Sequence, residues 1–98
     1  MANLKFTNKA VEDLNCIWEY TLEKWSTEQA DKYYEMLIKN CRRTANNPDL
    51  GKNYEGVRGD LFGLKSSRHI IFYRNDTDDS IEITRIMHNS MDLINRLR

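Results

Sequence analysis

Apolar residues along this chain follow two different periods, which separate helical from strand-forming parts. Between residues 11 and 25 they recur every three or four positions, the spacing of one buried helical face. That face would carry Val11, Leu14, Ile17, Trp18, Thr21, Leu22 and Trp25. A second series at the same spacing contains Ala30, Tyr33, Tyr34, Leu37, Ile38, Cys41 and Ala45. The pattern therefore predicts two helices, preceded by a short alternating strand at residues 4–7.

The predicted helices have recognisable ends. Thr7 or Asn8 can cap the first helix. Ser26-Thr27-Glu28-Gln29 is a capping-box pattern that opens the second, and Asn46-Asn47-Pro48 ends it. The connection between the two helices is short, so we expect an antiparallel hairpin.

The second half of the chain has a period of two. Residues 49–59 contain three glycines and no clear period, which predicts a loop with a binding role. Strands are predicted at 60–65, 68–74 and 81–87, separated by a tight turn at Ser66-Ser67 and a polar turn at 75–80.

Three details refine this pattern. The apolar run from Ile70 to Tyr73 indicates a central strand that is covered on both faces. The pattern shifts at Arg85-Ile86, which indicates a bulge. Residues 92–98 predict a short terminal helix with Met91, Leu93, Ile94 and Leu97 as the apolar residues around it.

The order of elements is strand, helix, helix, three-stranded meander and short helix. This order predicts an α+β fold in which a helical hairpin lies on one face of a small, mostly antiparallel sheet. The length of 98 residues suits one domain, spanning residues 1–98.

Composition narrows the class of function. Fifteen Lys and Arg balance fifteen Asp and Glu, so the chain lacks the overall basic charge of a nucleic-acid-binding module, and we expect no direct sequence-specific nucleic-acid binding. No apolar run is long enough for a signal peptide or a membrane span, and a cytoplasmic location is expected. Cys16 and Cys41 form no disulfide framework, and we expect both to be reduced, small core-side residues.

Local charge is less balanced than total charge. Residues 58–74 contain several cations and one acid, Asp60; the cations are Arg58, Lys65, Arg68 and Arg74, with His69 among them. Two hairpin strands could collect them into one basic patch. The alternative is that edge strands carry such residues to block sheet-to-sheet pairing.

A metal-independent ribonuclease is the main enzymatic alternative. It needs an acid, a base and cations for the phosphate, which Arg68, Arg74, Arg85 and His88 could supply. A single His at a strand end is more often a hydrogen-bonded structural residue. The histidines and cysteines have no metal-ligand spacing, so neither a metal nor a cofactor is expected.

Several segments together resemble the ParE toxins of the RelE/ParE superfamily. They are Asn47-Pro48-Asp49-Leu50-Gly51-Lys52, Val57-Arg58, His69-Ile70-Ile71-Phe72-Tyr73-Arg74 and Ile83-Thr84-Arg85-Ile86-Met87-His88-Asn89-Ser90-Met91-Asp92. The resemblance covers nearly the whole chain and implies the RelE/ParE-like fold. It also implies the toxin of a type II toxin–antitoxin pair, which a ParD-like antitoxin holds inactive and which traps DNA gyrase on broken DNA.

Two other functions remain open. The RelE branch cleaves mRNA on the ribosome, but its members tend to carry more lysines around the sheet and often a C-terminal Tyr after a His-Arg pair. Here Asn89 follows His88, and no Tyr occurs after Tyr73. The other possibility is an antitoxin-binding protein without toxic activity.

The resemblance also suggests roles for particular residues. A gyrase-binding surface should be exposed and somewhat basic, which selects Lys65, Arg68, Arg74, Arg96 and Arg98. The antitoxin is expected to contact Glu12, Glu19, Glu23 and Trp25 on the helical hairpin. No catalytic residue is expected. Arg85, His88 and Asp92 are structural candidates, with His88 holding the last strand to the terminal helix through Asp92.

Overall fold

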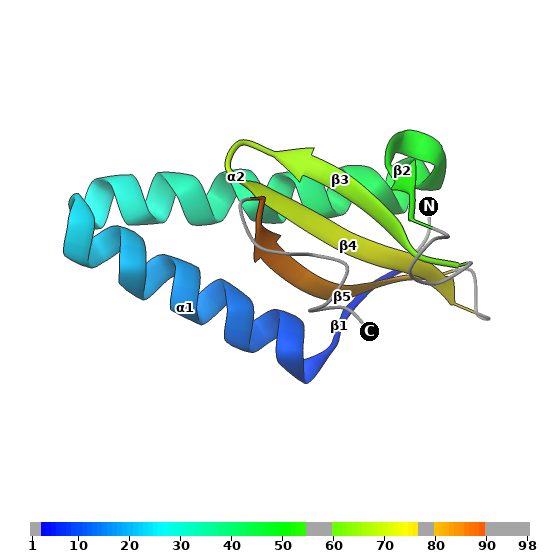
Figure 1. Ribbon diagram of the computed structural model, residues 1–98, viewed down its shortest axis with the longest axis horizontal. Helices are drawn as coiled ribbons and strands as arrows, with labels where there is room; N and C mark the ends of the chain where they lie inside the picture. Colours follow the sequence, from blue (N-terminus) through cyan, green and yellow to red (C-terminus); the bar gives the residue numbers. More distant parts are fainter. Residues whose placement is uncertain (1–2, 55–59, 77–79, 90–98) are drawn as a thin grey trace.

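A hairpin of two helices lies against one face of a mixed β-sheet in the computed structural model (Figure 1). The structure describes residues 3–54, 60–76 and 80–89. Its elements are β1 (Asn3–Phe6), α1 (Asn8–Lys24), α2 (Thr27–Asn46), the 3₁₀ turn η1 (Pro48–Leu50), β2 (Lys52–Asn53), β3 (Phe62–Ser66), β4 (His69–Asp76) and β5 (Ser80–His88). The predicted α+β architecture is confirmed.

The helix ends follow the capping rules. The Thr7 side chain accepts a hydrogen bond from the Ala10 amide at 3.1 Å, and the Ser26 side chain accepts one from the Gln29 amide at 3.2 Å. Each bond satisfies an amide that the first helical turn leaves without a backbone partner. The second helix ends at Asn46, just before Pro48, as predicted.

The sheet has the strand order β1-β5-β4-β3-β2 within the described residues. The first strand runs parallel to β5, and the other neighbouring strands are antiparallel. Residues Ile70–Tyr73 of β4 are all buried. The prediction of a central strand covered on both faces is therefore confirmed.

Each face of the sheet contributes to an apolar cluster. The face toward the helices packs β-strand side chains such as Ile71 and Ile83 against Leu37 and Cys41 of α2. Burial raises the pKa of the Cys41 thiol to about 12, so this thiol stays protonated. The outer face buries Leu61, Ile70, Phe72 and Met87, with Tyr54 packed against them.

The predicted helical faces are partly wrong at their margins. Val11, Trp25 and Tyr34 are exposed although the spacing placed them on buried faces. Cys16 is exposed rather than core-side, while Cys41 is buried as expected; both thiols are free. The tip of the helical hairpin extends beyond the end of the sheet (Figure 1), which leaves Trp25, at the end of α1, exposed.

The predicted loop at 49–59 begins with regular structure instead. Residues 48–50 form η1, and β2 pairs with β3 through Lys52 and Asn53. The Tyr73 hydroxyl holds this segment, because it accepts a hydrogen bond from the Gly51 amide and donates one to the Pro48 carbonyl, both at 2.8 Å. A Cβ on Gly51 would lie 2.6 Å from that hydroxyl oxygen, which explains the glycine.

The strand ends also differ slightly from prediction. Ser66 belongs to β3 and is buried, where its hydroxyl accepts a hydrogen bond from the Asn40 side chain at 2.7 Å. The tight turn is therefore Ser67-Arg68, with Ser67 at a φ of 57°. The predicted irregularity in the last strand is present, but one residue earlier than Arg85-Ile86: Phe72 pairs with Arg85 and Tyr73 with Ile83, so Thr84 is the extra residue.

Two expectations are limited by the described part of the chain. The predicted terminal helix at 92–98 lies outside the described residues. Among those residues, no helix combines the length and apolarity that crossing a membrane requires.

Candidate functional site

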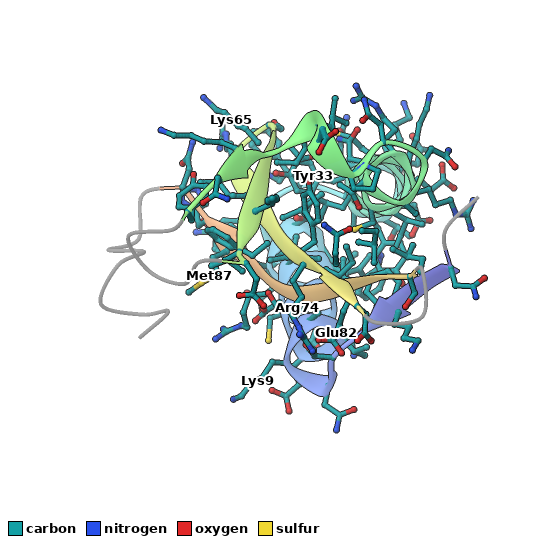
Figure 2. The ribbon with its side chains drawn as sticks, turned by 90° about the vertical axis from the view of Figure 1, so that its right-hand side faces the viewer. Lys9, Tyr33, Lys65, Arg74, Glu82 and Met87 are labelled. Atoms are coloured by element: carbon teal, nitrogen blue, oxygen red, sulfur yellow. The ribbon has the colours of Figure 1, made fainter. Side chains whose placement is uncertain are left out.

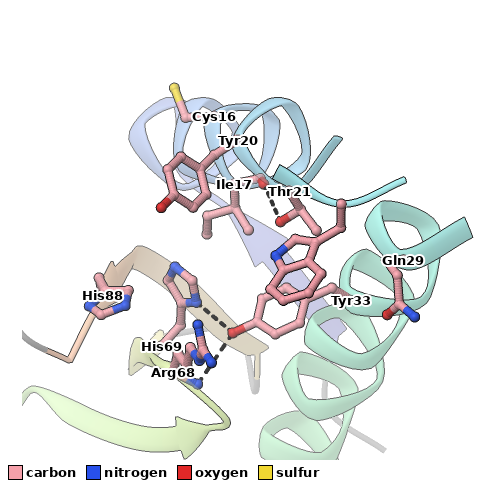
Figure 3. Close-up of a pocket in the computed structure, with 10 residues that line it drawn as sticks. Cys16, Ile17, Tyr20, Thr21, Gln29, Tyr33, Arg68, His69 and His88 are labelled. Carbon is pink, nitrogen blue, oxygen red and sulfur yellow. Dashed lines mark hydrogen bonds between the residues drawn. The ribbon is translucent and has the colours of Figure 1, made fainter. Parts of the chain in front are cut away.

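A groove of about 560 Å³ lies between the tip of the helical hairpin and the end of the sheet (Figure 3). Its described lining is mostly apolar and comes from α1, the start of α2, the β3–β4 turn and the end of β5. The lining residues are Cys16, Ile17, Tyr20, Thr21, Trp25, Gln29, Tyr33, Arg68, His69 and His88. A concave apolar surface with a few convergent polar groups is the usual form of a binding site.

The polar floor of the groove is a cluster around Tyr33. Its hydroxyl lies 2.6 Å from Nδ1 of His69 and accepts a hydrogen bond from the Arg68 amide at 3.3 Å. The His69 and His88 rings meet edge to face, with their centroids 5.2 Å apart. These two histidines are paired directly across β4 and β5.

His69 is neutral at physiological pH. Burial, and to a smaller extent the nearby His88, lower its pKa to about 4, against an opposing effect of Asp13. A neutral ring can accept the Tyr33 hydroxyl proton at Nδ1, which accounts for the short contact. His69 therefore contributes a hydrogen-bonding group to the groove rather than a cation.

Arg68 places a cation at the edge of the groove. It is exposed in the turn between β3 and β4, and its carbonyl accepts a hydrogen bond from the Asn89 amide at 2.9 Å. Its guanidinium makes no ion pair with the described part of the chain. The groove thus combines aromatic walls with one unmatched positive charge.

The opposite end of the sheet carries a row of alternating charges on its outer face. Arg74 contacts Glu82 at 2.9 Å and Asp60 at 3.8 Å, and Lys5 lies 3.5 Å from Asp76. Figure 2 shows Arg74 and Glu82 side by side. The hydrogen bond from Arg74 to Glu82 raises the pKa of Arg74. Carboxylates of the protein therefore already compensate the charge of Arg74.

Arg85 is matched by a different carboxylate. Its Nε and one terminal nitrogen donate to Asp13 of α1 at 2.8 and 3.2 Å, and this hydrogen bonding raises the Arg85 pKa. Asp13 Oδ2 also accepts a hydrogen bond from the Ile86 amide at 3.0 Å. The pairing of β5 with β1 stops at Ile83, so Asp13 satisfies an amide on the strand edge that β1 leaves uncovered.

Comparison with known proteins identifies the family. Residues 4–93 match the family described as "ParE toxin of type II toxin-antitoxin system, parDE". The chain belongs to the ParE toxin family. It is 32% identical over 91 residues to Toxin ParE1 of Caulobacter vibrioides, covering 93% of each chain. It is 31% identical over 77 residues to Toxin ParE1 of Mycobacterium tuberculosis, covering 79% of each.

Solved structures agree with the RelE/ParE-like fold. A chain of the chromosomal ParDE toxin–antitoxin system from P. aeruginosa superposes with a TM-score of 0.77 at 21% identity, over 90% of this chain and 96% of that one. A chain of the RelBE2 toxin–antitoxin complex from Mycobacterium tuberculosis gives a TM-score of 0.60 at 19% identity, over 90% and 98%. At these identities the likeness establishes the shared fold.

The target-binding candidates that the structure describes lie at different places on the sheet of this ParE-family chain. Lys65 pairs with Ile70 and shares the outer face of the sheet, while Arg68 borders the groove. Arg74 is four residues further along β4 than Ile70, about 13 Å at the usual rise per residue. Arg96 and Arg98 lie outside the described residues.

The candidate antitoxin contacts all belong to α1 or its end. Glu12, Glu19 and Glu23 are exposed, and Glu12 lies 3.7 Å from Lys9. Trp25 is 67% exposed and lines the groove. Of the structural candidates, Arg85 binds Asp13 and His88 meets His69, whereas Asp92 is outside the described residues.

Sequence reasoning missed two residues of this region. The apolar spacing placed Tyr33 on the buried face of the second helix, where it does pack against the core, but it did not reveal that the hydroxyl organises the groove floor. Asp13 was not singled out, and it holds both Arg85 and the uncovered strand edge. The polar Asp13 beside the apolar series on α1 was the available signal, but its partners are more than 70 residues away.

Proposed function

We propose that this ParE-family toxin is neutralised by a ParD-like antitoxin and, when free, acts on DNA gyrase to trap cleaved DNA and block replication. The observation that carries the proposal is the match to the ParE family over residues 4–93. The arrangement of charged groups is consistent with it, because such a toxin needs a binding surface rather than a catalytic centre.

Of the four residues that the sequence offers for phosphodiester cleavage, Arg68 and His88 line the groove, whereas Arg74 and Arg85 do not. Arg74 and Arg85 are each held by a carboxylate of the protein, so their charge is already compensated. His69, which neighbours His88, is five residues from Arg74 along β4, about 17 Å at the usual rise. We infer that the toxin is not itself an enzyme.

Gyrase poisoning needs only differential affinity. The gyrase makes the DNA break, and the toxin must bind the cleaved complex more tightly than the other states. Lys65 and Arg68 are the described target candidates that are exposed and free of an ion pair with the described residues. They are the side chains most available to contact gyrase or the DNA beside it.

Purified gyrase with supercoiled plasmid and ATP tests this target directly. We expect linear DNA to accumulate with toxin concentration once gyrase is denatured, and added antitoxin to suppress it. The double variant Lys65→Ala/Arg68→Ala should lower the yield of linear DNA, whereas Arg74→Ala is a matched cation control. DNA processed normally at toxin excess, while cells expressing the toxin stop growing, would exclude gyrase as the target.

The antitoxin is proposed to bind through a disordered tail that folds on the toxin. Such a tail would lay apolar side chains along the helical hairpin and add a strand at a sheet edge. The exposed Trp25, Tyr20 and Tyr34 support this, since large exposed apolar side chains mark interaction surfaces. Amide hydrogen exchange should slow on α1, α2 and a sheet edge when antitoxin is added; unchanged exchange there would contradict this binding mode.

Ribosome-dependent mRNA cleavage is the second candidate function. The similarity to a chain of a RelBE2 complex and the cluster of Arg68, His69 and His88 favour it. We expect mRNA on translating ribosomes to stay intact with this toxin. Cleavage in register with codons, abolished by His88→Ala, would establish the ribonuclease function instead.

A further inference from the structure

The half of α2 that leads to η1 presents only cations and amides outside the core. This half lies away from the hairpin tip (Figure 1) and contributes no residue to the described lining of the groove. Between residues 39 and 47 the buried side chains are Cys41, Thr44 and Ala45. The other residues of this stretch are all Lys, Arg or Asn: Lys39, Asn40, Arg42, Arg43, Asn46 and Asn47. This side of α2 therefore offers positive charge and hydrogen-bonding groups without an apolar anchor.

Helical geometry brings the three cations of this stretch together. Lys39, Arg42 and Arg43 fall within an arc of about 100° around the helix axis and within about 6 Å along it. We call these three residues the basic face of α2. The Arg43 guanidinium donates a hydrogen bond to the Asn40 side chain at 3.0 Å, and Asn40 donates one to Ser66 of β3 at 2.7 Å. These bonds position Arg43, but a neutral amide does not compensate its charge.

The charge of the basic face is not compensated by nearby carboxylates. Residues 36–48 contain no Asp or Glu, and none of the three cations makes an ion pair with the described part of the chain. The effect of the helix dipole falls off within the last turn, so it can account for Arg43 but not for Lys39 or Arg42. The basic face therefore keeps its positive charge for a partner.

The chemistry of the basic face favours a phosphate backbone over a polypeptide. Contacts between proteins are anchored by aromatic and apolar side chains, and charge is depleted at their centre. Contacts with nucleic acid are instead polar and strongly positive, and Arg, Lys and Asn side chains all bind phosphate oxygens. Duplex DNA carries one negative charge per about 1.7 Å of its axis, so several phosphates lie within the span of the three cations.

We propose that the basic face of α2 binds the phosphate backbone of duplex DNA, independently of sequence, through Lys39, Arg42 and Arg43. Each arginine can bind two phosphate oxygens at once, and the lysine adds a point charge. The contact is weak, since only three cations take part and the chain has no net charge. The inference goes beyond the proposed function, because the contact is with DNA itself and does not depend on gyrase.

Fluorescence anisotropy of a labelled duplex of arbitrary sequence, titrated with purified toxin, tests this contact. At about 50 mM salt we expect a Kd of about 10–100 µM that rises steeply with salt concentration. The variant Lys39→Gln/Arg42→Gln/Arg43→Gln should raise Kd at least about tenfold and lower the slope of log Kd against log salt by about 3. Arg42→Gln alone changes one exposed side chain and should lower that slope by about 1.

A matched variant elsewhere on the protein provides the control. Lys5→Gln/Lys9→Gln/Lys24→Gln makes the same change in net charge on β1 and α1, where Lys5 and Lys9 each pair with a carboxylate of the protein. Its Kd should stay within about twofold of the unmodified toxin, with an unchanged salt slope. Arg42→Lys/Arg43→Lys keeps both charges and should also keep the slope. Circular dichroism checks that all variants are folded.

Three results would overturn the inference. The first is a duplex that stays unbound at low salt. The second is an equal loss of slope in the two triple variants, which would place the contact outside the basic face. The third is competition by polyglutamate as strong as that by unlabelled duplex at equal charge concentration, which would indicate an acidic polypeptide rather than a phosphate backbone as the partner.

The gyrase assay separates this inference from the proposed function. If the toxin produces no linear DNA with gyrase but binds the duplex through the basic face, the DNA contact stands and the proposed target is wrong. If the toxin produces linear DNA but does not bind the duplex, the target stands and the DNA contact is wrong.

Discussion

The arginines at the two ends of the sheet differ in whether a carboxylate of the protein pairs with them. At the outer-face row, Arg74 contacts Glu82 and Asp60. At the groove, six residues earlier in the chain, Arg68 has no such partner among the described residues. A net charge of zero therefore hides an uneven distribution, with matched charge at one end and an available cation at the other.

This difference decides whether an arginine mainly stabilises the fold or is available to bind a partner. A matched, partly buried ion pair contributes to the fold and offers little to a partner, since breaking it costs what the new contact gains. An exposed cation contributes little to the fold and keeps its charge for a partner. The variants below should follow that order, with the largest losses of stability at matched charges.

Asp13→Ala should have the largest effect on stability. It leaves Arg85 without its bidentate partner and the Ile86 amide without an acceptor. We expect a loss of about 2–3 kcal/mol in the free energy of unfolding, measured by urea denaturation. Glu12→Ala, one residue earlier and paired only on the surface with Lys9, should cost less than about 0.5 kcal/mol. Equal losses in the two variants would contradict the role of Asp13.

Acidification should destabilise the groove end of the molecule. The pKa of His69 is about 4 in the folded protein against 6.5 for an unperturbed histidine, so the unfolded chain binds the proton more tightly. The stability contributed by neutral His69 is complete above pH 6.5 and is lost as pH falls toward 4. After allowance for solvent screening we expect a loss of about 1–2 kcal/mol.

The matched measurement for this effect uses His69→Gln, which keeps a hydrogen-bonding side chain but does not titrate. Unfolding free energies at pH 7 and pH 4.5 should differ less in this variant than in the unmodified protein. The comparison removes the contribution of carboxylates, which titrate in both proteins. Identical pH dependence in the two would show that His69 is not the responsible group.

Substitution of Arg74 or Arg68 should have the smallest effects on the free energy of unfolding. Arg74→Ala should lower the unfolding free energy by about 1 kcal/mol, because it removes a partly exposed pair with Glu82. Arg68→Ala should change it by less than about 0.5 kcal/mol. Thermal unfolding of both variants tests this order, and a larger loss for Arg68→Ala would mean that its side chain supports the fold.

The helical hairpin was predictable because its signals are local. The Thr7 and Ser26 caps, the stop before Pro48 and the spacing of apolar residues each depend on neighbours within one or two turns. The buried run at Ile70–Tyr73 likewise identified the central strand. These features need no knowledge of distant contacts.

The site depends on contacts between residues that are far apart in the sequence, and local patterns do not reveal such contacts. Tyr33 reaches His69 across 36 residues, and Asp13 reaches Arg85 across 72. An apolar period places Tyr33 on the inner side of α2 but does not reveal what its hydroxyl meets. The two-residue strand β2 escaped prediction for the same reason, since its pairing with β3 rather than its composition makes it a strand.

The parallel pairing of β1 with β5 has a consequence for the order in which the protein is made. Leu4 and Phe6 pair with Ile81 and Ile83, so β1 is synthesised long before the strand with which it pairs. The helical hairpin can form before β5 is synthesised, whereas the sheet closes only after it. A nascent chain interrupted before Ser80 lacks the partner strand of β1 and one wall of the groove, so truncated translation products should not accumulate as folded toxin.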